Sequence, residues 1–197
     1  MGKSLEQRVA ELEKQIQKII GDKAIHINKS LGVGDTFELA GISWKILDIT
    51  DKGYLCLADK INSMKFDDDN NNWKSSYLRD YLNTDFYKEL SKDIGEDNII
   101  PFERDLLSLD GQTEYGTCED KISLLTVDEY RKYRSLIPNT DDYWWWLITP
   151  WSTPCNDYKK TVAVVSSSGN IISYGCSYDY GVRPVCIFSS SIFESEE

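Results

Sequence analysis

The stretch YWWWLITP, residues 143–150, places three tryptophans in a row at the start of an apolar run that ends at a proline. A short apolar run of this kind predicts a buried strand. Successive side chains of a strand point to opposite faces of the sheet, so Trp145 is expected to face away from Trp144 and Trp146. We therefore expect at least two of the three in the core, packed against the strand that contains Trp44.

Other strand-like runs lie on both sides of this stretch, and helical patterns separate them. Residues 75–90 carry apolar side chains at helical spacing, and Thr126 with Glu129 predicts a capping box at the start of a further helix. Because the helices stand in the middle, the sheet has to pair early strands with late ones. The expected fold class is α+β, with antiparallel sheets and two or three helices. The expected strands are 36–39, 42–49, 54–58, 122–125, 161–166, 170–174 and 181–188, with a hairpin turn at 167–169.

The N-terminal segment carries a heptad pattern, which predicts a coiled-coil helix. Arg8 and Glu13 flank its apolar seam in the spacing Arg-apolar-x-x-apolar-Glu, which resembles a trimerisation signature. We expect a trimerising coiled coil at 1–22, a linker at 23–34 and a head at 35–197. A helix docked on its own domain is the alternative. The residues expected at the trimer interface are Leu5, Arg8, Val9, Leu12, Glu13, Ile16 and Ile19.

Charge and hydropathy exclude two classes of partner. Asp and Glu number 33 against 22 Lys and Arg, a net charge of −11. Such a surface repels a polyanion, and no basic stripe compensates, so we expect no nucleic-acid partner. No run of about 18 apolar residues occurs, so we expect no membrane insertion. The start of the chain also lacks the apolar core of a secretory signal.

The residues that usually carry chemistry are sparse. His26, the only histidine, falls in the expected linker, so a histidine-based triad is not expected and we assign no catalytic residue. The five cysteines are scattered, without a CxxC pair, and are expected to be reduced thiols. The Asp and Asn run at 67–72 offers oxygen ligands for calcium but lacks the glycine and distal glutamate of an EF-hand loop. We expect it to be a solvated loop, and the head to need no metal or cofactor.

Five ordered sequence blocks carry a family resemblance. Together they are similar to an uncharacterised domain family common in Firmicutes and their phages, with the pattern W-x-x-S-x-L-R-x-W/Y-L-N, then K-I-x-L-L-S/T, then WWLRSP, then GVRPA. The resemblance covers about residues 33–190, although Ile148 stands where the family has arginine. From its surroundings, Arg183 in the last block is expected to bond backbone carbonyls near the core. The blocks are GISWKILD at 41–48, WKSSYLRDYLN at 73–83, DKISLLT at 120–126, YWWWLITP at 143–150 and GVRPV at 181–185.

That family resembles the C-type lectin fold, including its formylglycine-generating and phage-variable branches. The resemblance thus implies a C-type-lectin-like head. The formylglycine-generating enzymes use a closely spaced cysteine pair, whereas Cys176 and Cys186 lie ten residues apart, so that activity is not carried over. Together with the expected trimer, the resemblance implies a phage or phage-derived receptor-binding protein, trimeric and not an enzyme. It would be made in the bacterial cytoplasm and placed at the tail or receptor-binding tip of a virion.

The segment between Pro150 and Gly181 is rich in Tyr, Ser, Asn and Gly, as adaptable binding loops are. The resemblance includes phage-variable proteins, which diversify the corresponding stretch of their own chains. Its ligand would be a bacterial cell-surface glycan or a surface protein. Two alternatives stay open: a structural tail or decoration protein that contacts only other phage tail proteins, and an enzyme of the formylglycine-generating group. The candidate ligand-binding residues are Trp151, Asn156, Tyr158, Tyr174, Tyr178 and Tyr180.

Overall fold

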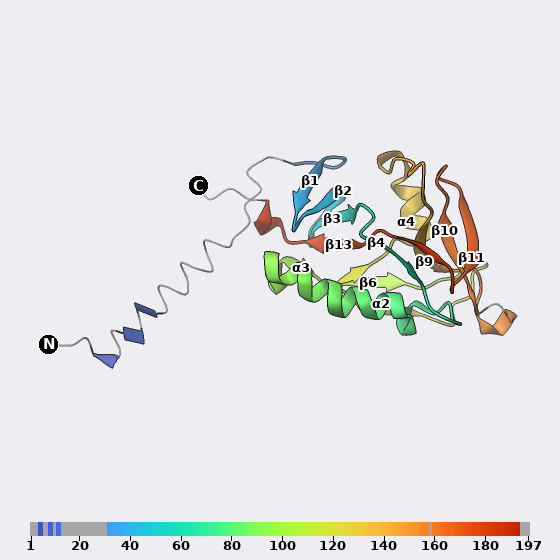
Figure 1. Cartoon of the computed structure of the whole chain (residues 1–197), viewed down its shortest axis with the longest axis horizontal. Helices are drawn as coiled ribbons and strands as arrows, with labels where there is room; N and C mark the ends of the chain where they lie inside the picture. Colours follow the sequence, from blue (N-terminus) through green and yellow to red (C-terminus); the bar gives the residue numbers. More distant parts are fainter. Residues whose placement is uncertain (1–3, 6–7, 10, 13–30, 158, 194–197) are drawn as a thin grey trace.

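The computed structural model describes residues 4, 5, 8, 9, 11, 12, 31–157 and 159–193. Within them the fold is α+β, as expected, and along the chain the helices α2, α3 and α4 come between the early strands and the late ones. In Figure 1, α2 and α3 run along the lower side of the head.

The first sheet joins the beginning of the head to its end. Its strand order is β1-β2-β3-β13-β5, and β8 also pairs with β13. The pairing of β3 with β13 confirms that early strands meet late ones. Cys56 lies opposite Cys186 in this pairing, and both are buried free thiols. The strands are β1 (Thr36–Leu39), β2 (Ile42–Thr50), β3 (Gly53–Ala58), β5 (Ile99–Ile100), β8 (Ile122–Ser123) and β13 (Val185–Phe188).

The second sheet has the order β11-β10-β9-β12-β4, with β9 and β12 parallel and the other pairs antiparallel. Trp146 belongs to one buried cluster, with Trp44, and Trp145 belongs to the other. Trp144 packs against the cluster of Trp146, so the expected alternation is confirmed. The strands are β4 (Asn62–Lys65), β9 (Trp145–Pro150), β10 (Thr161–Val165), β11 (Ile171–Gly175) and β12 (Asp179–Val182).

The expected single strand at 181–188 is wrong. The chain instead forms β12 in the second sheet and β13 in the first, and the break falls at Arg183 and Pro184. Proline has no backbone N–H to give to a ladder, so the strand cannot run through it. Arg183 is buried at this crossing, where its Nε donates to the carbonyl of Ala58 at 3.1 Å. Its structural role is as expected.

The helical run expected at 75–90 is longer and less regular than its pattern suggested. It consists of η1 (Trp73–Ser75), α2 (Tyr77–Tyr81), the π turn η2 (Leu82–Phe86) and α3 (Tyr87–Ile94). Asn83 lies in the π turn, and its side chain bonds the backbone of Lys121 and Ile122. The irregular turn therefore ties the helices to β8, and their apolar side chains pack into the core that both sheets share.

A shorter helix covers the opposite side. α4 (Val127–Lys132) begins with the expected capping box between Thr126 and Glu129. Its residues Val127 and Tyr130 pack in the second buried cluster with Trp145. A separate two-stranded sheet completes the fold. The remaining elements are β6 (Phe102–Asp105), β7 (Thr117–Asp120), η3 (Glu96–Asn98), η4 (Arg134–Leu136), η5 (Pro154–Asn156) and η6 (Ser190–Ile192).

The Asp and Asn run at 67–72 is not simply a solvated loop, which corrects the expectation. Asp67 and Asn71 are buried, while Asp68 and Asp69 are exposed. Asp67 accepts hydrogen bonds from three backbone N–H groups of the loop and of Tyr77. Buried polar groups need such partners. The run is therefore partly a structural junction.

The N-terminal segment is described only in part. Residues 5, 8, 9, 11 and 12 are helical, and Leu5, Val9 and Leu12 are 77%, 45% and 56% exposed. No part of the described chain covers these seam side chains. Three more of the expected interface residues, Glu13, Ile16 and Ile19, lie outside the described residues, so the trimer stays a prediction.

The packed part of the chain reaches back into the expected linker, because Leu31 lies in the core. None of the described helices has the length and apolar character needed to cross a bilayer.

Candidate functional site

Four aromatic side chains gather at one edge of the core, and we call them the aromatic cluster: Trp144, Tyr174, Tyr178 and Tyr180. The Trp144 and Tyr180 rings are stacked, 21° apart with centroids 5.8 Å apart. Tyr174 stands nearly perpendicular to both, at 5.3 Å from Trp144 and 5.5 Å from Tyr180. Tyr178 extends the stack beyond Tyr180, at 6.4 Å. The cluster therefore presents ring faces in two orientations.

The sheet order brings these side chains together. Tyr174 is on β11, Tyr180 is on β12, and Trp144 immediately precedes β9. Because alternate residues share a face, Trp144 lies on the same side as Trp146, whose ring contacts Tyr180 at 5.0 Å. Trp146 is fully buried, so the cluster is the outer end of the core, built on a rigid base.

Gly181 allows the close packing at this edge. A Cβ atom at this position would lie 2.8 Å from the Tyr143 ring and 3.0 Å from the Trp144 carbonyl oxygen. Any side chain would thus displace the Tyr143 ring or the backbone at Trp144. A glycine at this position keeps Tyr143 beside the cluster.

A hollow of about 410 Å³ opens beside the aromatic cluster. The Tyr174 and Tyr178 side chains are 36% and 57% exposed, although Tyr178 is not part of the lining. The lining combines aromatic faces with two exposed carboxylates. Its residues are Ser63, Asp142, Tyr143, Trp144, Tyr174, Asp179, Tyr180 and Gly181.

The structure brings together some of the expected ligand-binding residues and separates others. Tyr174, Tyr178 and Tyr180 form the cluster. Trp151 is 43% exposed but makes no ring contact with the cluster or any other described aromatic side chain. Asn156 lies in η5, and Tyr158 lies outside the described residues.

Asn156 takes part in a hydrogen-bond network around Asp110. The Asp110 carboxylate accepts hydrogen bonds from the Ser108 hydroxyl, from Ser152 Oγ at 2.6 Å and from Asn156 Nδ2 at 2.9 Å. These bonds, with that of Ser108 the strongest, lower the pKa of Asp110 to about 2. The Asn156 amide is thus already engaged within the chain, which makes it a weaker candidate than the tyrosines.

Trp144 was not among the expected ligand-binding residues, because at least two of the three consecutive tryptophans were expected in the core. A signal for it was present, because the alternation put Trp144 on the same face as Trp146. What the alternation could not tell is that the core ends between these two residues, which leaves Trp144 half-buried.

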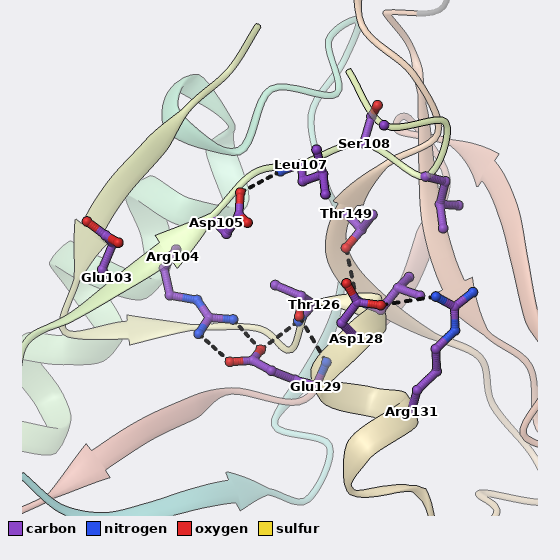
Figure 2. A pocket seen from close by; sticks show the side chains of 13 residues that line it. Glu103, Arg104, Asp105, Leu107, Ser108, Thr126, Asp128, Glu129, Arg131 and Thr149 are labelled. Atoms are coloured by element: carbon purple, nitrogen blue, oxygen red, sulfur yellow. Dashed lines mark hydrogen bonds and ion pairs between the residues drawn. The ribbon is translucent and has the colours of Figure 1, made fainter. Parts of the chain in front are cut away.

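A second hollow, of about 380 Å³, lies between β6, the loop at 106–111 and the start of α4 (Figure 2). Several of its polar groups are paired, although Arg104 Nε has no hydrogen-bond partner among the described residues. Arg104 Nη1 donates to Glu129 Oε1 at 2.7 Å, and Arg104 Nη2 donates to the Leu124 carbonyl at 2.9 Å. Thr149 Oγ1 accepts from the Val127 N–H at 2.9 Å. Figure 2 shows the pairing of Arg104 with Glu129 in this hollow.

The charged groups Glu129 and Arg104 of this second hollow also stabilise the fold. Burial works against the charge of Glu129, but the hydrogen bonds and charge of Arg104 outweigh it, so the pKa of Glu129 is lowered. The carboxylate stays ionised as the partner of a buried arginine. The hollow beside the aromatic cluster, which is lined by aromatic side chains and two exposed carboxylates, is therefore the better candidate for a ligand site.

Neither hollow is lined by a histidine or a cysteine. Nowhere in the described part of the chain do three His, Cys, Asp or Glu side chains form a group able to hold a metal ion.

Comparison with known proteins gives one match. The model of a family described as "Domain of unknown function (DUF6273)" matches residues 51–190. This range includes every residue that lines either hollow. No curated protein and no solved structure matches the chain.

Proposed function

We propose, from the premise that the chain belongs to the family described as Domain of unknown function (DUF6273), that its head is a non-catalytic recognition domain. The observation that carries the proposal is the aromatic cluster, exposed at the edge of a buried sheet beside an open hollow. Tyrosine and tryptophan offer a large contact area at low entropic cost, and exposed groups of them often mark recognition sites.

The lining suits a cell-surface ligand. Aromatic faces cover the apolar side of a sugar ring or of a side chain, while Asp142, Asp179 and Ser63 supply polar groups that fix its orientation. The phage resemblance gives this site its proposed context: a C-type-lectin-like head of a receptor-binding protein at the tail tip of a virion. A structural role is the competing proposal, in which the same cluster binds a neighbouring tail protein.

The attachment prediction uses the two most exposed tyrosines of the cluster. In the double variant Tyr174→Ala, Tyr178→Ala, the free energy of unfolding should change by no more than roughly 1 kcal/mol, because both rings are partly in solvent. Binding to an array of bacterial cell-wall glycans and surface proteins should weaken about tenfold or more. Binding is read on the array, and stability by thermal melting.

Tyr77→Ala is the matched control, because Tyr77 is 58% exposed, lies on α2 and makes no ring contact with a member of the cluster. It should bind as the unmodified chain does. The proposal is wrong if the unmodified chain binds nothing on the array, or if the double variant binds as well as the control.

The proposed trimer is tested separately. The exposed side chains of Leu5, Val9 and Leu12 support a seam that copies of the helix cover. Light scattering should give about three times the chain mass of 22.7 kDa, and a chain without residues 1–22 should be a folded monomer. Three linked heads would turn weak sites into avid ones. A monomeric full-length chain would contradict the trimer and leave the recognition site unaffected.

A further inference from the structure

We propose that the hollow beside the aromatic cluster binds an alkylated ammonium group, so that the ligand of the head is a cation. This inference rests on the proposed recognition function and names the chemical class of its ligand.

The first argument is the density of ring faces. Tyr143, Trp144, Tyr174 and Tyr180 all line the hollow. The face of an aromatic ring is the negative part of its quadrupole and attracts cations, with tryptophan the strongest of the three aromatic types. Because Tyr174 is nearly perpendicular to Trp144 and Tyr180, a group in the hollow meets rings from two directions.

The second argument is that one of these rings already binds an ammonium group of the chain itself. Lys60 Nζ stands 4.4 Å from the centroid of the Tyr143 ring. Lys60 does not line the hollow, so its ammonium group leaves the space beside Trp144 and Tyr174 open. The contact shows that the face of the Tyr143 ring is placed where it can accept a cation.

The third argument is charge. Asp142 and Asp179 line the hollow, both are exposed, and no described group donates a hydrogen bond to either carboxylate. Two lysines lie near these groups: Lys60 stands over the ring of Tyr143, and Lys65, opposite Asp179 on β4, pairs its ammonium with Asp68 at 3.1 Å. Burial raises the pKa of both Tyr143 and Tyr180, so these phenols are neutral near pH 7. With a net charge of −11 on the chain, an anionic ligand is disfavoured and a cationic one is attracted.

An alkylated ammonium fits these features better than a compact cation does. Its methyl groups make apolar contact with the rings. Removing its charge from water also costs less free energy than removing the charge of a metal ion. In addition, no metal-binding group of side chains occurs among the described residues. The hollow is open on one side, so the rest of a larger ligand can extend into solvent.

The test is a titration of the full-length chain with choline and with 3,3-dimethyl-1-butanol, its neutral isostere. Tryptophan fluorescence and calorimetry follow the binding. We expect saturable binding of choline and binding of the neutral alcohol weaker by about tenfold or more. Equal affinity for the two compounds, or no binding of choline, would overturn the inference.

Variants locate the site. Tyr174→Ala should abolish choline binding, and Asp142→Asn with Asp179→Asn should weaken it about fivefold while binding of the neutral alcohol stays unchanged. Tyr77→Ala, on α2, should bind choline normally. If the asparagine variant binds choline as the unmodified chain does, the carboxylates play no part and the inference fails.

The glycan and protein array separates this inference from the proposed function. If the chain binds the array through the aromatic cluster but choline neither binds nor competes, recognition stands and the ligand class is wrong. If choline binds and nothing on the array does, the cation site stands and the recognition role is wrong.

Discussion

Replacing Glu129 by alanine is expected to lower the free energy of unfolding by roughly 3–5 kcal/mol. The reason is that the substitution leaves Arg104 buried without its partner. The Arg104 side chain is only 3% exposed, and two of its nitrogens bond the Glu129 carboxylate. Without that carboxylate a buried guanidinium keeps one hydrogen bond, to Leu124, and loses its countercharge. Denaturant unfolding followed by tryptophan fluorescence measures the change.

Asp128→Ala is the matched control, one residue away in the same turn of α4. Its carboxylate pairs with Arg131, but the two side chains are 80% and 61% exposed, so the change should be within roughly 0.5–1 kcal/mol. Equal effects of the two substitutions would show that burial of Arg104 does not determine the outcome.

The same pair predicts how stability responds to acid. The pKa of Glu129 is lower in the folded chain than the value of about 4.3 expected in the unfolded chain. The stabilisation is therefore fully present above about pH 4.3, and it is lost as the pH falls through the lower folded value. The Glu129→Ala variant should lack this part of the acid dependence.

Replacing Asn71 by alanine is expected to cost roughly 2–4 kcal/mol. Asn71 is fully buried, and its Nδ2 donates to the carbonyls of Ser152 and Thr161, both at 2.9 Å. Its Oδ1 accepts from the Tyr115 hydroxyl at 2.7 Å. Alanine would leave these partners in the interior without the bonds that they make to this amide. Chemical denaturation again gives the size of the loss.

Asp68→Ala serves as the control from the same run of Asp and Asn residues. Asp68 is exposed and pairs only with Lys65, so its loss should change stability by no more than roughly 0.5–1 kcal/mol. If Asn71→Ala costs as little as Asp68→Ala, the run acts as a surface loop throughout. Because Asn71 bonds the segments at the ends of β9 and β10, its replacement should also loosen the sheet that carries the aromatic cluster.

Features that depend on neighbouring residues could be read from the sequence alone. The opposite facing of Trp145 and Trp146 follows from strand geometry, and the start of α4 follows from the spacing of Thr126 and Glu129. The α+β class follows from the order of such local patterns. The composition of the segment after Pro150 also pointed to the tyrosines that form the cluster.

Only the tertiary structure decided the features that depend on distant partners. A strand pattern does not say which sheet it joins, so the division of 181–188 between two sheets at Pro184 was not foreseen. The residue types in a run do not say which of them is covered, so Asn71 looked no different from Asp68. Trp144 joins Tyr174 and Tyr180, while Trp151 stays apart, because strand order and the end of the core place side chains from separate segments. Those placements are set by packing between residues far apart in the chain, which local periodicity and composition do not encode.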